Sequence, residues 1–309
     1  MNLVINLKIV SCGEVLWDLF PEGARFGGAP ANFACHAAIL GGKVSMLSAV
    51  GKDSRGEDAL SILKGLDIDT SLIQCDADTP TGSVGINVDD EGKPNYEIHA
   101  PSAWDYIAWT NELDSRVAQI DAIYFGTLGQ RSELSRATIQ QAIQIAKAHG
   151  VLRVLDVNLR MPFYDAALIR ESISQASVLK LSDEELVEVA AACDIALDTN
   201  PETTLRQLLT RFKLDLVVMT RGSKGAILVS PTESIIEPGV TTIVRDTVGA
   251  GDSFTAALTI GLLRGDALAT IARTACETAA AVCAHDGAIP SLPISFHSKS
   301  KQCVPPQNL

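Results

Sequence analysis

A carboxylate directly follows a glycine-rich turn in the last quarter of the chain. Residues 246–254 read Asp-Thr-Val-Gly-Ala-Gly-Asp-Ser-Phe, and a stretch of small and apolar residues follows at 256–263. That stretch predicts a helix, so Gly249, Ala250 and Gly251 stand where a helix begins and its first N–H groups lack internal partners. Glycines let the backbone approach a ligand closely, so this turn could bind a phosphate or a developing anion. Asp252 could accept a proton from an attacking hydroxyl.

A structural role for Asp252 competes with this chemical one. An aspartate at the N-cap or in the first turn of a helix is common and needs no ligand. The nine residues alone do not separate the two interpretations, because short motifs also occur by chance. Residues 241–244 favour β-structure, which predicts a strand leading into the turn.

Further polar residues follow three predicted strands. They are Asn158 and Arg160 after residues 151–157, Ser182 and Glu185 after residues 177–181, and Thr220, Gly222 and Gly225 after residues 216–220. Ligands of open parallel sheets bind at the carboxyl ends of the strands, so these residues and Asp252 are expected to form one site. On the structural alternative, Ser182 and Glu185 are a helix capping box.

A second glycine turn lies near the N-terminus. Residues 27–32 read Gly-Gly-Ala-Pro-Ala-Asn, and Pro30 suits the first turn of a helix that ends at 41–42. Asn32 is the polar residue of that first turn, and the alternative is a surface or capping asparagine. Asp18 stands within the apolar stretch 14–20, where a solvent-facing position is the simpler expectation.

The elements that position these residues alternate between strand and helix. The predicted strands are residues 7–12, 43–50, 122–125, 151–157, 177–181, 216–220, 226–229 and 235–237, and the predicted helices are 30–40, 54–64, 132–149, 165–175, 201–212, 256–263 and 267–284. This order predicts an α/β fold with a mostly parallel sheet covered by helices on both faces. Residues 84–88 and 95–99 predict a hairpin, which could form a small extra sheet with residues 14–20.

Composition narrows the class of protein. The 309 residues are 47% hydrophobic and 20% charged, with a formal net charge of −12. That balance fits a globular domain and disfavours nucleic acid or an anionic membrane as a partner. Seven scattered cysteines without a C-x-x-C pair predict reduced thiols in a cytoplasmic protein. No apolar run approaches the roughly 18 residues of a membrane span.

These residues together could transfer a phosphoryl group to a hydroxyl. The reaction needs a proton acceptor, donors for the charge on the moving group, and a metal ion with the nucleotide phosphates. Asp252 could be the acceptor, the N–H groups of residues 249–251 the donors, and Arg160 a fixed positive charge. Glu185 could hold Mg²⁺ through water, and Gly222 and Gly225 would leave room for a nucleotide.

The two glycine motifs resemble those of the PfkB (ribokinase-like) carbohydrate kinases, and most closely those of the fructokinases. Residues 27–32 are similar to the family's N-terminal motif, and residues 246–254 match its C-terminal motif almost letter for letter. Gly13, Glu14 and Asp18, together with residues 156–160 and 220–225, occur in the family's order. The resemblance covers about residues 8–293.

This resemblance implies a fold and an activity. The fold would be a three-layer α/β/α kinase domain over residues 1–295, with a β-sheet lid from residues 14–26 and 83–108 and a loosely held tail at 296–309. The enzyme would transfer the γ-phosphate of ATP to a primary hydroxyl of a monosaccharide, with fructose as the expected sugar. It would use Mg²⁺ and K⁺, and the lid would form a homodimer.

The resemblance also implies residue roles. Asp252 would be the general base, and residues 249–251 the anion hole. Asp18, Gly28 and Asn32 would hold sugar hydroxyls, and Ser182, Glu185, Thr220, Gly222 and Gly225 would belong to the nucleotide site. The monovalent cation would lie beside Asp246, Val248, Gly287 and Ser291. Where the family commonly has Asn-x-x-Glu, this chain has Ser182 before Glu185, which puts its Mg²⁺ network in question.

Three alternatives stay open at the level of sequence. Ribokinases and 2-keto-3-deoxygluconate kinases share the same motifs, although residues 103–105 (Ala-Trp-Asp) favour a fructokinase. A non-catalytic sugar- or nucleotide-binding regulator could use the same fold, with Ser182 as its only support. A dinucleotide-dependent oxidoreductase would need a G-x-G-x-x-G turn after the first strand, where this chain has Gly13-Glu14-Val15.

Overall fold

The main sheet runs through the centre of the protein. The computed structural model describes residues 6–88 and 94–290. Within these residues the sheet has nine strands in the order β13-β12-β11-β10-β9-β8-β1-β4-β5, and only β12 and β13 are antiparallel to their neighbours. The strands are β1 (Lys8–Cys12), β4 (Lys43–Gly51), β5 (Ile73–Asp76), β8 (Ala122–Phe125), β9 (Leu152–Asp156), β10 (Val178–Ser182), β11 (Leu216–Thr220), β12 (Ala226–Val229) and β13 (Ser234–Glu237).

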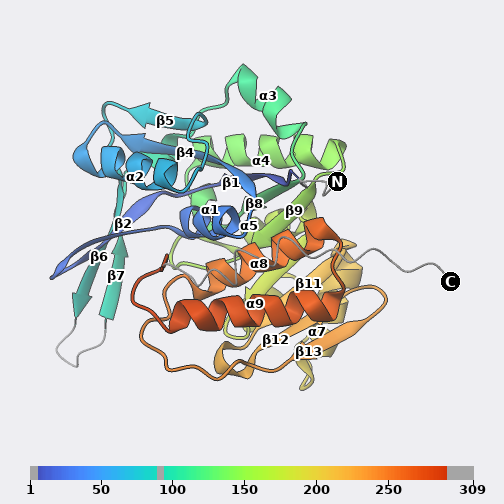
Figure 1. Ribbon diagram of the computed structural model, residues 1–309. Helices are drawn as coiled ribbons and strands as arrows, with labels where there is room; N and C mark the ends of the chain where they lie inside the picture. The colour runs from blue at the N-terminus through green and yellow to red at the C-terminus, as the bar shows by residue number, and fades with distance from the viewer. Residues whose placement is uncertain (1–5, 89–93, 291–309) are drawn as a thin grey trace, which may run out of the picture.

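Helices cover both faces of this sheet, which makes three layers (Figure 1). One face carries α1 (Ala29–Ile39), α2 (Ser54–Gly65), α8 (Ala250–Arg264) and α9 (Leu268–Cys283), and the other carries α3 (Asn111–Val117), α4 (Glu133–Ala148), α5 (Ala166–Gln175), α6 (Leu186–Ala192) and α7 (Pro201–Phe212). Each face has its own buried apolar cluster. The predicted ribokinase-like α/β architecture is therefore confirmed.

A smaller sheet projects from one end of the main sheet (Figure 1). Its order is β3-β2-β6-β7, with β2 (Leu16–Phe20), β3 (Gly23–Gly27), β6 (Gly82–Val88) and β7 (Pro94–Ile98). Strand β2 pairs antiparallel with β3 and parallel with β6. The predicted hairpin and the residue 14–20 segment thus belong to one sheet, and the residues between β6 and β7 lie outside the described part.

Several local predictions differ from the structure. Residues 241–244 form no strand, because β13 already closes this edge of the sheet and the segment after it crosses to helix α9, where Arg245 N–H donates to the Cys283 carbonyl. Strands β3 and β5 and helix α3 were not predicted, since each is short and lacks a regular apolar period. The helix expected at Ser182 begins at Leu186 instead.

Trp104 and Asp105 serve the fold. They lie in a short 3-10 helix, Ala103–Tyr106, which follows β7 after residues 99–102. Arg131 donates from Nε and Nη2 to the two carboxylate oxygens of Asp105, both at 2.7 Å, and stacks over the Trp104 ring at 3.9 Å. All three side chains are buried. These residues fix the small sheet to the main body, and they do not line the cavities described below.

We expect Asp105→Asn to lower the free energy of unfolding by about 3–5 kcal/mol, because it leaves the buried Arg131 guanidinium without its counter-charge. Urea denaturation would measure the loss. Asp194→Asn is the matched control, since Asp194 is 79% exposed and lies 3.9 Å from Arg211; we expect no measurable change for it. Equal stabilities of the two variants would contradict this role for Asp105.

Candidate active site

Two cavities open at the carboxyl ends of the strands and meet at the glycine turn. The first, of about 450 Å³, lies between the small sheet and helices α1 and α8, and its lining includes Glu14, Asp18, Gly28, Asn32, Asn158, Arg160, Lys180, Gly249 and Asp252. The second, of about 550 Å³, lies between the β11–β12 turn and helix α9, and its lining includes Thr220, Gly222, Gly225, Val240, Phe254, Ala279 and Cys283. Thr247 and Gly251 line both cavities. A group passing between the cavities would therefore pass the start of α8.

The turn before α8 presents backbone N–H groups. Gly249 is the N-cap in a left-handed conformation, with φ of 78°, and no side chain caps the helix. The N–H of Ala250 donates to the Thr247 carbonyl at 3.3 Å and closes the turn. Within the described residues, the N–H groups of Gly249, Gly251 and Asp252 take no hydrogen-bond acceptor. Anion binding is thus open to these three groups. Asp252 is not the N-cap, but it does lie in the first turn, as the other form of the structural alternative expected.

Asp252 lies in the first turn of α8 and faces α1. Its Oδ2 accepts a hydrogen bond from Asn32 Nδ2 at 2.9 Å, which joins the two glycine motifs 220 residues apart in the chain. Burial, together with the nearby Asp156 carboxylate, raises the pKa of Asp252 to about 6 against the opposing effects of Asn32, Lys180 and Arg160. A carboxylate with this pKa is ionised at neutral pH and is a better proton acceptor than an exposed aspartate.

We expect the turnover number to fall as the pH is lowered through about 6. The base acts only when it is ionised, and the raised pKa of Asp252 brings its protonation into that range. The pH dependence of kcat at saturating substrates would show one acidic limb. A rate that stays constant down to pH 4.5 would contradict the assignment of Asp252 as the titrating group.

A buried ion pair on strands β9 and β10 lies next to the start of helix α8. Lys180 Nζ lies 3.0 Å from Asp156 Oδ2, and the two residues are register partners on β10 and β9. Thr255 Oγ1 of helix α8 donates to the same carboxylate at 3.1 Å. Burial opposes the charge on Lys180, but the facing carboxylates of Asp156 and Glu185 keep its pKa above the usual value. The pair therefore carries little net charge and fixes α8 on the sheet.

The N-terminal motif forms the opposite wall of the first cavity. Gly28 has φ of 102°, and a Cβ there would lie 2.7 Å from the Glu14 carbonyl oxygen, so only glycine fits. Asp18 is half-buried on β2 and lines the cavity, so the solvent-facing expectation is wrong. Burial raises the pKa of Asp18, and Arg160 and Arg25 oppose this rise.

Glu185 lies just behind the first cavity. Its Oε1 accepts from the Leu159 N–H at 2.7 Å and its Oε2 from the Ser182 N–H at 2.8 Å, while Ser182 Oγ accepts from the Glu185 N–H at 3.2 Å. The reciprocal Ser182–Glu185 bonds have the pattern of a capping box, although they close a turn one residue before α6. Neither residue lines either cavity. Each carboxylate oxygen keeps a lone pair for water, so the carboxylate fits an outer-sphere magnesium ligand.

The expected cation site joins two loops. Asp246 Oδ1 accepts from the Val248 N–H and Oδ2 from the Gly287 N–H, both at 3.0 Å. This fits a role for Asp246 in holding the two loops together so that their carbonyl groups could surround a cation. Arg25 Nη1 of β3 lies 3.6 Å from Asp246 Oδ2 and already balances its charge. Ser291 lies outside the described residues.

The sequence and the fold of this chain are similar to those of known proteins. The pfkB family of carbohydrate kinases matches residues 22–295. The chain belongs to that family. It is 29% identical to probable fructokinase-5 of Arabidopsis thaliana, with 92% of this chain and 94% of the relative covered, and 30% identical to fructokinase-2 of Zea mays, with 85% and 82% covered. The fructokinase of Vibrio cholerae O395, solved with fructose, ADP and calcium, superposes with a TM-score of 0.80 at 25% identity over 94% of this chain and 99% of that one.

This protein is thus a carbohydrate kinase of the pfkB family, and its predicted site residues gather accordingly. Asp18, Gly28, Asn32, Arg160 and Asp252 share the first cavity with Gly249 and Gly251, and Thr220, Gly222 and Gly225 share the second with Ala250 and Gly251. Ser182, Glu185, Asp246 and Gly287 lie behind or beside these cavities. No helix in the described part of the kinase is both long and apolar enough to cross a membrane.

Three charged residues that line the kinase's first cavity, Glu14, Asp156 and Lys180, were not predicted as site residues. Lys180 lies within an apolar strand and Glu14 follows one, and both are buried. A charged residue within or just after an apolar strand is the feature of the sequence that could have indicated these site residues. Burying a charge without a partner is costly, so such a residue is expected to have a partner or a ligand. Their partners come from distant segments, so only the structure reveals what they face.

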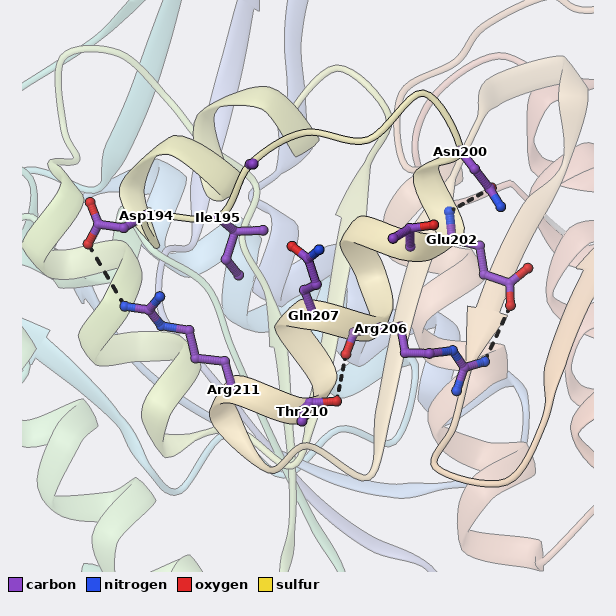
Figure 2. Close-up of a pocket in the computed structure, with 10 residues that line it drawn as sticks. Asp194, Ile195, Asn200, Glu202, Arg206, Gln207, Thr210 and Arg211 are labelled. Atoms are coloured by element: carbon purple, nitrogen blue, oxygen red, sulfur yellow. Dashed lines mark hydrogen bonds and ion pairs between the residues drawn. The ribbon is translucent and has the colours of Figure 1, made fainter.

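A third pocket of the kinase, of about 650 Å³, lies beside helix α7 (Figure 2). Its charged side chains pair with one another, Arg206 with Glu202 at 3.3 Å and Arg211 with Asp194 at 3.9 Å. It shares no lining residue with the two cavities at the turn. We therefore assign it no part in the reaction.

Proposed function

We propose that this pfkB kinase transfers the γ-phosphoryl group of ATP to a primary hydroxyl of fructose. The meeting of the two cavities at Thr247 and Gly251 carries the proposal, because it would bring a sugar and a nucleotide to opposite sides of one anion-binding turn. The fructokinase names of its relatives support fructose as the acceptor.

The chemistry rests on the start of helix α8. Asp252 removes the proton from the attacking hydroxyl while the hydroxyl oxygen bonds to the γ-phosphorus of ATP. The bond from that phosphorus to the β,γ-bridging oxygen breaks, and ADP leaves. The N–H groups of Gly249 and Gly251, with the positive end of the helix dipole, stabilise the charge on the moving phosphoryl group, and Arg160 adds a positive charge. Ala250 closes the turn that aims these donors.

The two substrates occupy one cavity each. Asp18, Asn32 and the backbone at Gly28 hold the hydroxyls of the sugar in the first cavity. The adenine nucleotide lies in the second cavity along Thr220, Gly222 and Gly225, where the glycines admit the backbone close to it. Glu185, positioned by Ser182, would hold Mg²⁺ through water, where the ion would neutralise charge on the nucleotide phosphates. The serine in place of asparagine keeps a side-chain oxygen that binds the Glu185 N–H.

The small sheet acts as a lid over the sugar in this proposal. Strand β2 contributes Leu16 and Asp18 to the first cavity, and β6 and β7 contribute Val84 and Ile98. In this proposal the kinase domain comprises residues 1–295, with lid segments 14–26 and 83–108; the tail expected at 296–309 lies outside the described residues. The lid also forms a homodimer, which light scattering tests through a mass twice that of the chain. The free thiols of the described residues support a cytoplasmic location.

Potassium should raise the rate. A cation bound beside Asp246, Val248, Gly287 and Ser291 would order the loop that carries Gly249, because Asp246 bonds to both segments. We expect replacement of K⁺ by tetramethylammonium at equal ionic strength to lower kcat several-fold. Unchanged rates in the two salts would contradict a monovalent-cation site.

A coupled ADP-release assay over a panel of sugars tests the function. We expect fructose to give the highest kcat/KM, above ribose and 2-keto-3-deoxygluconate. A higher kcat/KM for ribose or for the sugar acid would replace the proposed substrate. If no sugar of the panel led to ADP release, the proposal that this kinase phosphorylates a sugar would be contradicted.

A further inference from the structure

We propose that Glu14 is a further sugar-binding residue, which accepts a hydrogen bond from a substrate hydroxyl, and that with Asn32 it restricts the first cavity to uncharged polyhydroxy sugars. This inference rests on the proposed kinase function and specifies which class of sugar that site takes. Its test is arranged so that the two can fail separately.

Glu14 is a buried carboxylate in the wall of the first cavity. It lies one residue beyond the carboxyl end of the central strand β1, after Gly13, and its side chain packs against Gly28 and Gly129. Only 2% of the residue is exposed. The backbone N–H groups of Glu14 itself and of Ala29, the first residue of α1, lower the pKa of its carboxyl group. Its Oε2 is buried and has no partner among the described residues.

An unpartnered buried carboxylate oxygen is costly. A buried acceptor left without a donor loses its hydration and gains nothing in exchange, a penalty larger for a charged group than for a neutral one. Native proteins satisfy nearly all such groups with protein, water or ligand. Glu14 lines a cavity of sugar size, so the missing donor is expected from the cavity's occupant.

Asn32 presents the same requirement in the same cavity. Its Nδ2 donates to Asp252, which fixes the orientation of the amide and turns Oδ1 away from that carboxylate. Asn32 Oδ1 is buried and also lacks a partner among the described residues. The cavity therefore offers two unsatisfied acceptors from two elements, and an occupant that satisfies both must supply two donors. Adjacent hydroxyl groups of a sugar supply them, whereas a carboxylate or phosphate group supplies none at neutral pH.

The charged groups around the cavity also favour an uncharged sugar. Glu14, Asp18 and Asp252 face it with acceptor groups, while Asp156 compensates Lys180, which leaves Arg160 as the compensating cation of this wall. Burial, together with the Asp252 carboxylate, raises the pKa of Glu14 to about 7 against the opposing effects of backbone N–H groups and Arg160. An anionic substituent on the sugar would meet this acidic wall and be disfavoured.

The variant Glu14→Gln tests the contact, because it keeps the shape and replaces the acceptor at one oxygen by an NH₂ group. Calorimetric titration without nucleotide, at a pH above the Glu14 pKa of about 7 so that the carboxylate is ionised, would measure the affinity for fructose and for its mono-deoxy analogues. We expect roughly 10- to 100-fold weaker binding of fructose, the effect of losing one hydrogen bond to a charged group. One deoxyfructose should bind the wild type and the variant alike, which identifies the hydroxyl that Glu14 contacts. ADP affinity should not change, since Glu14 does not line the second cavity.

Two results would overturn the inference. One is unchanged fructose affinity in Glu14→Gln, and the other is an equal loss for fructose and every deoxy analogue. If the melting temperature shows that the variant does not fold, the affinities of the wild-type protein for charged and uncharged sugars still test the restriction. Fructose 6-phosphate and 2-keto-3-deoxygluconate should then bind at least 100-fold more weakly than fructose, and comparable affinity would refute the restriction to uncharged sugars. If the wild type phosphorylates another neutral sugar, fructose is wrong as the substrate while deoxy forms of that sugar still test Glu14.

Discussion

Asp252→Asn should lower kcat by roughly 10²- to 10⁴-fold and leave fructose affinity within a few-fold of the wild type. That range is the usual contribution of a general base to catalysis. The amide replaces the proton acceptor, yet its oxygen can still accept the hydrogen bond that Asn32 donates to Asp252 in the wild type. Rapid-quench turnover measurements and calorimetric titration of fructose separate the two effects.

Asp286→Asn is the matched control for this variant. Asp286 is 75% exposed and lies 3.4 Å from Arg245, near the same end of the molecule but outside both cavities. We expect its kinetics to match the wild type. If Asp252→Asn instead retained most of its turnover, or lost affinity and turnover by the same factor, Asp252 would be a binding group and the hydroxyl would need another base.

Gly249→Ala should have the second large effect, with a loss of roughly 10²- to 10³-fold in kcat, comparable to removing an oxyanion-hole donor. The backbone of Gly249 has φ of 78°, and a Cβ there would lie 2.5 Å from the Ala288 carbonyl oxygen. The turn must move to relieve this contact, and its N–H groups then no longer point at the phosphoryl group. Steady-state kinetics with ATP and fructose would measure the loss.

Two glycines of the same helix are its controls. Gly265 ends α8 with φ of 72°, and a Cβ there meets nothing within 4 Å, so Gly265→Ala should lower stability by about 1 kcal/mol without changing kcat. Gly251→Ala would place a Cβ 3.2 Å from Lys180 Nζ, a side-chain end that can shift, and should lose less than Gly249→Ala. A Gly265→Ala variant as inactive as Gly249→Ala would mean that helix stability, and not the turn, limits activity.

Local patterns in the sequence were enough to predict the layered α/β architecture and several of its helices and strands. The alternation of strands and helices predicted the layered sheet, and the bounds of α7, β8, β11 and β12 agree with the predicted ones, because each has an unbroken apolar pattern between turn residues. The strand predicted at residues 241–244 was wrong, because β-favouring side chains form a strand only where a neighbouring strand is available for pairing.

The site was predictable where residues stand beside a turn of unusual backbone geometry. Gly28 and Gly249 have positive φ, and each precedes a helix that carries a polar residue, Asn32 or Asp252, at the cavity. The contact between those two side chains spans 220 residues and depends on how α1 packs against α8. Pairwise spacing along the chain cannot reveal such a contact, and for the same reason the partners of Glu14 and Lys180 required the structure.

The central claim is that Asp252 and the adjoining turn direct a phosphoryl group from ATP to a primary sugar hydroxyl. The most direct measurement is phosphorus and carbon NMR of the product formed from ATP and fructose. We predict one new phosphomonoester signal, coupled to a CH₂ carbon of the sugar and formed in step with ADP. A phosphoester on a ring CH carbon, or free inorganic phosphate as the only product, would contradict the claim.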